Sequence, residues 1–156
     1  MQKRNSVAEL WAAWLIGLML AWASVGIAAA APAPISASHG WFRYLMAQIP
    51  AGGFVTLHND SAKTITLTGV SAASCGMAML HRSVDNSGTD RMVMVHSIAI
   101  PPHRRVQFKP GDYHIMCMQP TMQVGQTVPV IFHFRDAPDL TVPFKIYGAD
   151  QNPAKS

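Results

Sequence analysis

The sequence predicts a single all-β domain, built as a small antiparallel β-sandwich or barrel. Between residues 40 and 148 the chain divides into short segments rich in β-branched and aromatic residues, with turn residues about every eight to twelve positions. Polar and apolar side chains alternate in 64–68 and 128–134, as in strands with one buried face. No window after residue 30 keeps a helical period. A chain of 156 residues is typical of one domain.

Turn residues separate most of the expected strands. The expected strands span residues 41–47, 53–58, 63–70, 77–81, 91–98, 104–109, 112–118, 127–135 and 140–147. Clear turns are Pro50-Ala51-Gly52-Gly53, Asp85-Asn86-Ser87-Gly88 and Lys109-Pro110-Gly111-Asp112. In such turns Gly, Pro, Asn and Asp supply backbone geometry that a strand does not allow.

The first thirty residues have the pattern of a secretory signal peptide. Lys3 and Arg4 precede an uncharged apolar run, 10–27, and three alanines at 28–30 supply the small residues of a cleavage site. The run is also long enough for an uncleaved membrane anchor, which needs about 20 apolar residues. Either role places the rest of the chain outside the cytoplasm, and membrane attachment is expected only if the segment stays uncleaved.

The remaining chain is expected to have three parts. Residues 31–39 are small and Pro-rich and are expected to form a flexible tether. The domain is expected to span 40–148, and 149–156 to form a short tail.

The charge pattern does not favour a nucleic-acid partner. Only 13% of the residues are charged, and the net charge is +4. The one local concentration of positive charge is 103–105 with Lys109. A nucleic-acid site would show a basic stripe interleaved with aromatic residues.

The two cysteines, Cys75 and Cys117, leave one question open. An oxidising compartment permits a disulfide between them, and the sequence does not decide whether it forms.

Enzymatic activity is not expected. Glu is absent after Glu9, and most Asp residues lie at turns, where they serve backbone geometry. His114 lies near Cys117, but a nucleophilic pair also needs a third, orienting group. The common phosphate-binding, zinc-protease and hydrolase motifs are absent from the sequence.

Methionine is the unusual feature, with ten residues in a weakly charged chain. Seven of the eight after residue 30 form three groups beside histidines: Met77 and Met79 before His81, Met92 and Met94 before His96, and Met116, Met118 and Met122 after His114. Strand alternation sets His114, Met116 and Met118 on one face and Tyr113, Ile115 and Cys117 on the other. The same alternation groups Met77 and Met79 with His81, and Met92 and Met94 with His96.

Imidazole and thioether ligands together favour Cu(I). Thioether sulfur is neutral and soft, whereas structural zinc prefers thiolates or more imidazoles. Packing is the alternative, because Met commonly fills gaps in cores. It applies to Met77, Met79, Met94 and Met122 taken singly, and a structural role is the default for His58, His96, His103 and His133. His114 and Met116 stand out because they share one face next to a Gly-Asp turn.

Four of these residues follow the pattern H-x10-M-x21-H-x-M: His81, Met92, His114 and Met116. The pattern resembles the metal-binding signature of the periplasmic copper chaperones of the PCu(A)C type. Three segments are similar to that family as well: 40–43, 51–59 and 109–116. The chain departs from the family at Arg82 and Cys117, and its tail, 151–156, lacks the His- and Met-rich extension of some relatives.

The resemblance implies a cupredoxin-like Greek-key β-barrel and a periplasmic protein. A monomer is expected, and the sequence itself leaves the oligomeric state open. The resemblance also implies that His81, Met92, His114 and Met116 bind one Cu(I) per chain. The implied role is delivery of copper to an acceptor, such as a cytochrome c oxidase subunit or its assembly factor, during assembly of the binuclear copper site. Arg82, beside His81, would weaken or tune such a site by charge repulsion.

Three other functions are considered. One is an electron-transfer cupredoxin with His114, Cys117 and Met122 as ligands, although alternation turns Cys117 away from His114 and blue-copper loops carry Cys before the second His. Another is copper storage or resistance. The third is a metal-free adhesion or inhibitor module, in which Met only packs the core.

Overall fold

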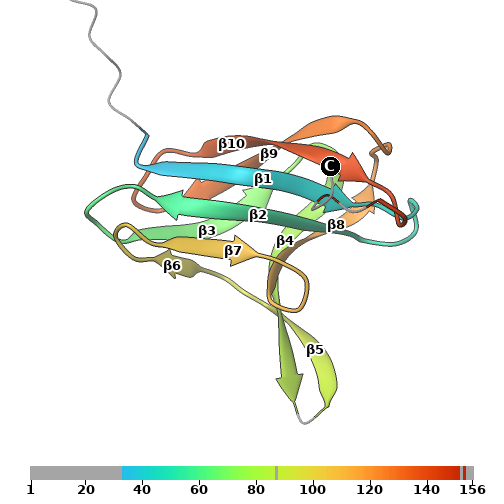
Figure 1. Ribbon diagram of the computed structural model, residues 1–156, viewed down its shortest axis with the longest axis horizontal. Coiled ribbons are helices and arrows are strands. Elements are labelled where there is room, and N and C mark those ends of the chain that lie inside the picture. The colour runs from blue at the N-terminus through green and yellow to red at the C-terminus, as the bar shows by residue number, and fades with distance from the viewer. Residues whose placement is uncertain (1–32, 87, 152, 154–156) are drawn as a thin grey trace, which may run out of the picture. The chain divides into compact units, whose positions relative to one another are not determined.

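Ten β-strands make up the computed structural model, which describes residues 33–86, 88–151 and 153 (Figure 1). They are β1 (Ile35–Arg43), β2 (Ala51–Asn59), β3 (Ile65–Ser71), β4 (Cys75–Asn86), β5 (Thr89–Met94), β6 (Ile98–Ile100), β7 (Arg105–Phe108), β8 (Tyr113–Pro120), β9 (Thr127–Phe134) and β10 (Leu140–Tyr147). The described residues contain no α-helix. Nowhere in them is there a helix with the length and apolar character needed to cross a membrane.

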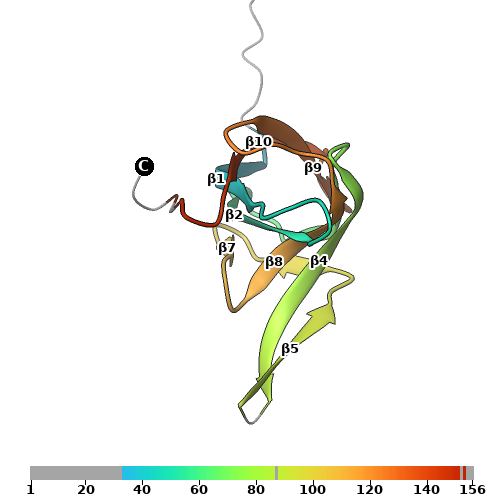
Figure 2. The ribbon, with the colours of Figure 1, turned by 90° about the vertical axis from the view of Figure 1, so that its right-hand side faces the viewer.

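The strands form one sheet in the order β5-β4-β8-β2-β1-β10-β9-β3-β6, with β7 pairing to β2. β1 and β10 run parallel, and the other neighbouring strands run antiparallel. The sheet curls around its apolar side (Figure 2). The curl brings β3 into contact with β4. The all-β class predicted from the sequence is confirmed.

The core lies inside the curled sheet and is centred on three phenylalanine rings. Phe42 of β1, Phe132 of β9 and Phe144 of β10 are all 0% exposed. The ring centroids of Phe42 and Phe144 lie 5.0 Å apart, and those of Phe132 and Phe144 lie 6.1 Å apart. Full burial of each ring stabilises the fold by about 1.5–3 kcal/mol. The core therefore fixes β1, β9 and β10 as a rigid support for the strands beside them.

The expected tether at 31–39 is wrong for its last five residues. β1 begins at Ile35, whose side chain is 2% exposed, and Ile35 pairs with Asn59 of β2. Burial of Ile35 and pairing with β2 together keep 35–39 in the sheet, so the domain begins before Gly40. The signal or anchor expected at 1–30 lies outside the described residues.

The strand expected at 91–98 is two strands. β5 ends at Met94 and pairs with β4, whereas β6 pairs with β3. The chain must leave one edge of the sheet and reach the other, and residues 95–97 form that link. β4 is also longer than expected, and its far end forms with β5 a hairpin that projects from the sheet (Figures 1 and 2).

A disulfide joins Cys75 of β4 to Cys117 of β8, with their Cα atoms 5.3 Å apart. The question left open by the sequence is therefore answered by the structure. The bond ties together the two strands that carry three of the four predicted ligands.

Candidate metal centre

The outward face of β5, β4 and β8 carries all four predicted ligands. These strands are neighbours in the sheet, and their register sets His81 of β4 directly opposite His114 of β8. Met116 lies two residues beyond His114 on the same strand, and Met92 of β5 lies opposite Ser83 of β4. Residues from four separate positions in the sequence thus come together on one surface.

The inward positions between these residues belong to the core. Leu80 is 3% exposed, and Ile115 and Cys117 are 0% exposed. The alternation predicted for β4 and β8 is therefore present in the structure. It fails on β5, because that strand ends at Met94 and His96 lies exposed in the loop that follows.

A hydrogen bond through one ring nitrogen orients His114, and the other ring nitrogen is available to bind a metal ion. Its side chain is largely buried, with 7% of the residue exposed, and its Nδ1 lies 2.9 Å from the carbonyl oxygen of Asp112. Because a carbonyl only accepts hydrogen bonds, Nδ1 carries a proton, and in the neutral ring Nε2 then keeps a free lone pair. Within the part of the chain that the structure describes, Nε2 is buried without a hydrogen-bond partner. This is the arrangement in which a backbone carbonyl orients a metal-binding histidine.

His81 offers a second unpartnered nitrogen beside the first. The two imidazole rings lie 6.0 Å apart between centroids, with 20° between their planes. His81 Nδ1 is buried and has no hydrogen-bond partner among the described residues. The two residues lie directly opposite each other on neighbouring strands, so the structure brings two nitrogens of the kind that bind transition metals to the same part of the sheet face. Unpaired buried polar atoms are costly, and a bound metal ion would satisfy both nitrogens.

The surroundings of His81 favour its neutral form. Burial, and then the neighbouring His114, lower the pKa of His81 below its ordinary value of 6.5. A metal ion binds only the neutral imidazole, so the lowered pKa extends the binding form of His81 to mildly acidic pH.

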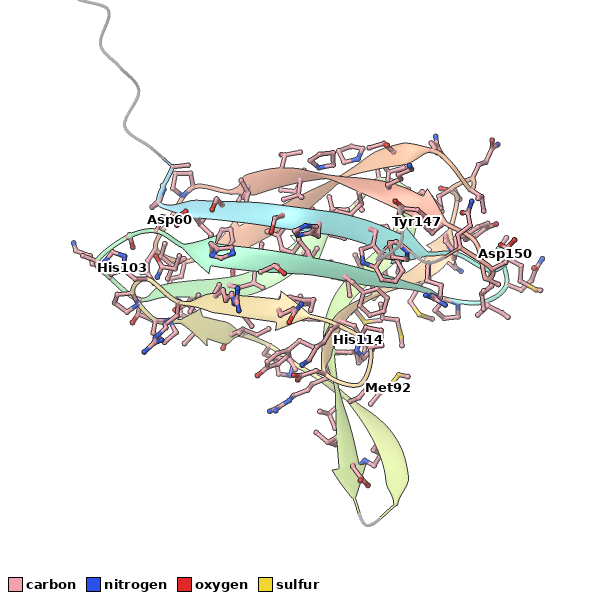
Figure 3. The ribbon with its side chains drawn as sticks, viewed as in Figure 1. Asp60, Met92, His103, His114, Tyr147 and Asp150 are labelled. Carbon is pink, nitrogen blue, oxygen red and sulfur yellow. A yellow bond between two sulfur atoms is a disulfide. The ribbon has the colours of Figure 1, made fainter. Side chains whose placement is uncertain are left out.

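A shallow cavity of about 290 Å³ opens on this face. Met92, His114 and Met116 line it, together with Gly52 and Phe54 of β2. Met92 is 61% exposed. In Figure 3, Met92 and His114 lie near each other where the β4–β5 hairpin leaves the sheet. Three of the four predicted ligands thus share one cavity, and His81 lies opposite His114.

Arg82, which the sequence marked as a source of repulsion, belongs to the other face of β4. Its Nε lies 3.3 Å from Oδ1 of Asp112, and its guanidinium lies over the ring of Tyr113 at 5.0 Å. The Asp112 carboxylate balances the positive charge, and the same residue's carbonyl orients His114. Arg82 therefore supports the position of Asp112 while its own charge is paired.

Met94 is a residue whose place the sequence did not indicate. It lies directly opposite His81 in the register of β4 and β5 and is 54% exposed. Only the register reveals this, because alternation places Met92 and Met94 on the same face without saying which one is opposite His81.

The donor set suits a soft ion. Across the described residues, no group of three or more His, Cys, Asp and Glu side chains is placed to hold one metal ion. Two imidazoles supplemented by neutral thioethers remain, and this combination favours Cu(I) over hard cations.

A blue-copper site is not favoured by the structure, because it requires a Cys thiolate. Cys117 is bonded to Cys75, lies in the core and faces away from His114. Met122, the axial ligand that such a site would use, is 3% exposed in the core. The same disulfide removes Cys117 as a nucleophile.

The comparisons with known proteins agree with the fold. The family model described as "Putative lipoprotein LpqE-like" matches residues 35–146. A relative from Rickettsia prowazekii (strain Madrid E), "Uncharacterized protein RP573", is 30% identical over 103 residues, which cover 64% of this chain and 56% of that protein. The chain therefore spans little more than half the length of this curated relative.

Two solved structures share the architecture. The copper-bound PCuAC domain from PmoF2 has a TM-score of 0.62 and 21% identity, covering 76% of this chain and 96% of that one. The solution structure of Cu(I)-DR1885 from Deinococcus radiodurans has a TM-score of 0.59 and 23% identity, covering 80% and 84%. The cupredoxin-like β fold predicted through the resemblance is confirmed.

Proposed function

We propose that this chain, which belongs to the LpqE-like lipoprotein family, is an exported protein that binds one Cu(I) ion and passes it to an acceptor. The observation that carries the proposal is the pair of unpartnered nitrogens, His81 Nδ1 and His114 Nε2, side by side on a sheet face rich in thioethers. The shared fold with copper-bound PCuAC domains supports it.

The proposed ligands are His81, Met92, His114 and Met116. All four are neutral, so Cu(I) keeps its single positive charge and no carboxylate or thiolate holds it by strong ionic attraction. Met92 is 61% exposed, and an incoming sulfur or nitrogen ligand can therefore replace its thioether first. A site that is open on one side and built from neutral ligands suits transfer better than storage.

The proposed acceptor is a protein of copper-centre assembly, such as a cytochrome c oxidase subunit or its assembly factor. The proposed location is the periplasm, reached through the N-terminal segment 1–30. Both follow from the resemblance to PCu(A)C chaperones. Transfer is tested by mixing the Cu(I)-loaded protein with a candidate acceptor under anaerobic conditions and measuring the copper in each after separation.

The binding proposal is tested by anaerobic titration of Cu(I) against a chromophoric chelator. The unaltered protein is expected to take one tightly held ion at this site. His114→Ala removes a buried nitrogen ligand and is expected to weaken binding by at least about tenfold, since removing even an outer partner of a metal ligand costs 10–100-fold. Met46→Leu is the matched control, because Met46 is 51% exposed in the β1–β2 loop. Equal affinities for the His114 and Met46 variants would refute the assignment.

A further inference from the structure

We infer that Met77, Met79 and Met118 form a second site for a soft monovalent ion, Cu(I) or Ag(I), next to the histidine site. These three residues are called the methionine ladder. The inference rests on the proposed Cu(I) function, because Met116 would be a neighbour of both sites, and it extends that function by naming an entry position for the ion.

The register brings the thioethers together in pairs. Met77 lies directly opposite Met118, and Met79 lies directly opposite Met116. Directly opposite side chains have Cβ atoms about 4.5–5.5 Å apart, and positions two residues along a strand are about 7 Å apart. Methionine has three rotatable bonds and a flexible thioether. Sulfurs that start from such positions can therefore converge on one ion.

The composition of this face is not that of ordinary packing. Between residues 77 and 81 of β4 and between 114 and 118 of β8, the outward positions hold only Met and His. Outward positions of a strand usually carry polar, β-branched or aromatic residues. Met77 is 58% exposed, whereas Met122, which does pack the core, is 3% exposed. Met79, Met116 and Met118 are half-buried on the same outward face. Thioethers in opposed pairs on the outward face are better explained by a ligand than by the core.

The chemistry of the ladder selects the ion. Three thioethers carry neither charge nor proton, so they offer little to Zn²⁺, Ca²⁺ or Mg²⁺, which prefer thiolate, imidazole or oxygen ligands. Cu(I) and Ag(I) are soft and accept neutral sulfur. Without a nitrogen ligand, the ladder is expected to bind more weakly than the histidine site, as an entry position should.

Met116 connects the two sites. It lies opposite Met79 on one side and two residues from His114 on the other. An ion held by Met79 can exchange one thioether for Met116 and then a second for His114 Nε2. Each exchange forms one bond to the ion and breaks one, and the ion keeps its charge. No proton needs to move when the ion exchanges onto the neutral His114 ring, because the proton of that ring is on Nδ1, bonded to the Asp112 carbonyl.

The test is the number of Cu(I) ions bound, measured by native mass spectrometry under anaerobic conditions. The unaltered protein is expected to bind two ions. The ladder variant, Met77→Leu with Met79→Leu and Met118→Leu, keeps the apolar volume and is expected to bind one. The histidine variant, His81→Ala with His114→Ala, is also expected to bind one, through the ladder. Met46→Leu is the control for loss of an exposed thioether and is expected to bind two.

The outcomes separate the two proposals. If the unaltered protein and the ladder variant both bind one ion and the histidine variant binds none, the ladder is overturned while the histidine site stands. If the unaltered protein and the histidine variant both bind one ion and the ladder variant binds none, the ladder stands and the histidine site fails. If the unaltered protein binds none, both fail.

A second measurement needs no variant of the ladder. Methyl carbon-13 labelling of methionine allows the NMR signals of the unaltered protein to be followed while silver nitrate is added. Beyond one equivalent, the methyl signals of Met77, Met79 and Met118 are expected to shift while that of Met46 stays fixed. Unmoved signals of the three ladder residues would overturn the inference.

Discussion

Reduction of the Cys75–Cys117 disulfide should destabilise the domain by a predictable amount. The bond closes a loop with a sequence separation of 42 residues. The chain-entropy relation for a loop of that length gives about 13 cal/mol/K, or about 4 kcal/mol at 25 °C. This corresponds to a change of roughly a thousandfold in the folding equilibrium constant. It should lower the midpoint of thermal unfolding by roughly 10–20 °C.

The assay is guanidinium unfolding of the metal-free protein, with and without a phosphine reductant. Because domains typically unfold with about 5–15 kcal/mol, the reduced protein should still fold in buffer, and the two curves can be compared. The double variant Cys75→Ala with Cys117→Ala is the control, and reductant should leave its midpoint unchanged.

A change below about 1 kcal/mol between the oxidised and reduced protein would refute this reasoning. It would mean that the unfolded chain keeps residual contacts across the loop, or that backbone hydrogen bonds and packing alone hold β4 and β8 together. A fall well above 4 kcal/mol would instead show that the bond also supports native packing around Cys117.

Three further predictions concern stability. Asn59 is 1% exposed and donates from Nδ2 to three backbone carbonyls, at 2.7, 2.8 and 3.1 Å. Asn59→Asp removes these donors and should lower the free energy of unfolding by roughly 2–4 kcal/mol in denaturant titration. At Gly53 an added Cβ would lie 2.5 Å from Cε1 of Phe42, so Gly53→Ala should destabilise by about 1–3 kcal/mol. Gly69→Ala, with its nearest contact at 3.8 Å, should change little, and equal effects of the two glycine variants would contradict the crowding argument. Because the pKa of His81 is lowered below 6.5 by burial and by His114, the unfolded state binds more protons below that pH. The free energy of unfolding of the metal-free protein should therefore decrease as pH falls below about 6.5 and be insensitive to His81 above it, and His81→Gln should reduce this dependence.

Local patterns in the sequence were enough to predict the fold class. They also predicted which side chains of β4 and β8 share the outward face. Alternation is a property of each strand alone, so the shared face of His114 and Met116 follows from their spacing. Register is not local, because it depends on which strand becomes the neighbour and where pairing begins. The direct opposition of His81 to His114 and to Met94 therefore came only from the structure.

Strand ends were the other part that the sequence could not supply. Ile35 follows two Ala-Pro pairs and looks like part of a linker. Its side chain is nevertheless buried, and it is the first residue of β1. His96 continues the alternation of Met92 and Met94 in the sequence, yet β5 stops before it because the chain must cross to β3. In both cases tertiary packing decided where the strand lies.

The central claim is that one Cu(I) is held by two histidines and two methionines on the outward face of β4, β5 and β8. X-ray absorption spectroscopy of the protein loaded with one equivalent of Cu(I) tests it most directly. The account predicts two nitrogen and two sulfur scatterers around the ion, with loss of one nitrogen in His114→Ala. A spectrum without sulfur, or one that His114→Ala leaves unchanged, would contradict it.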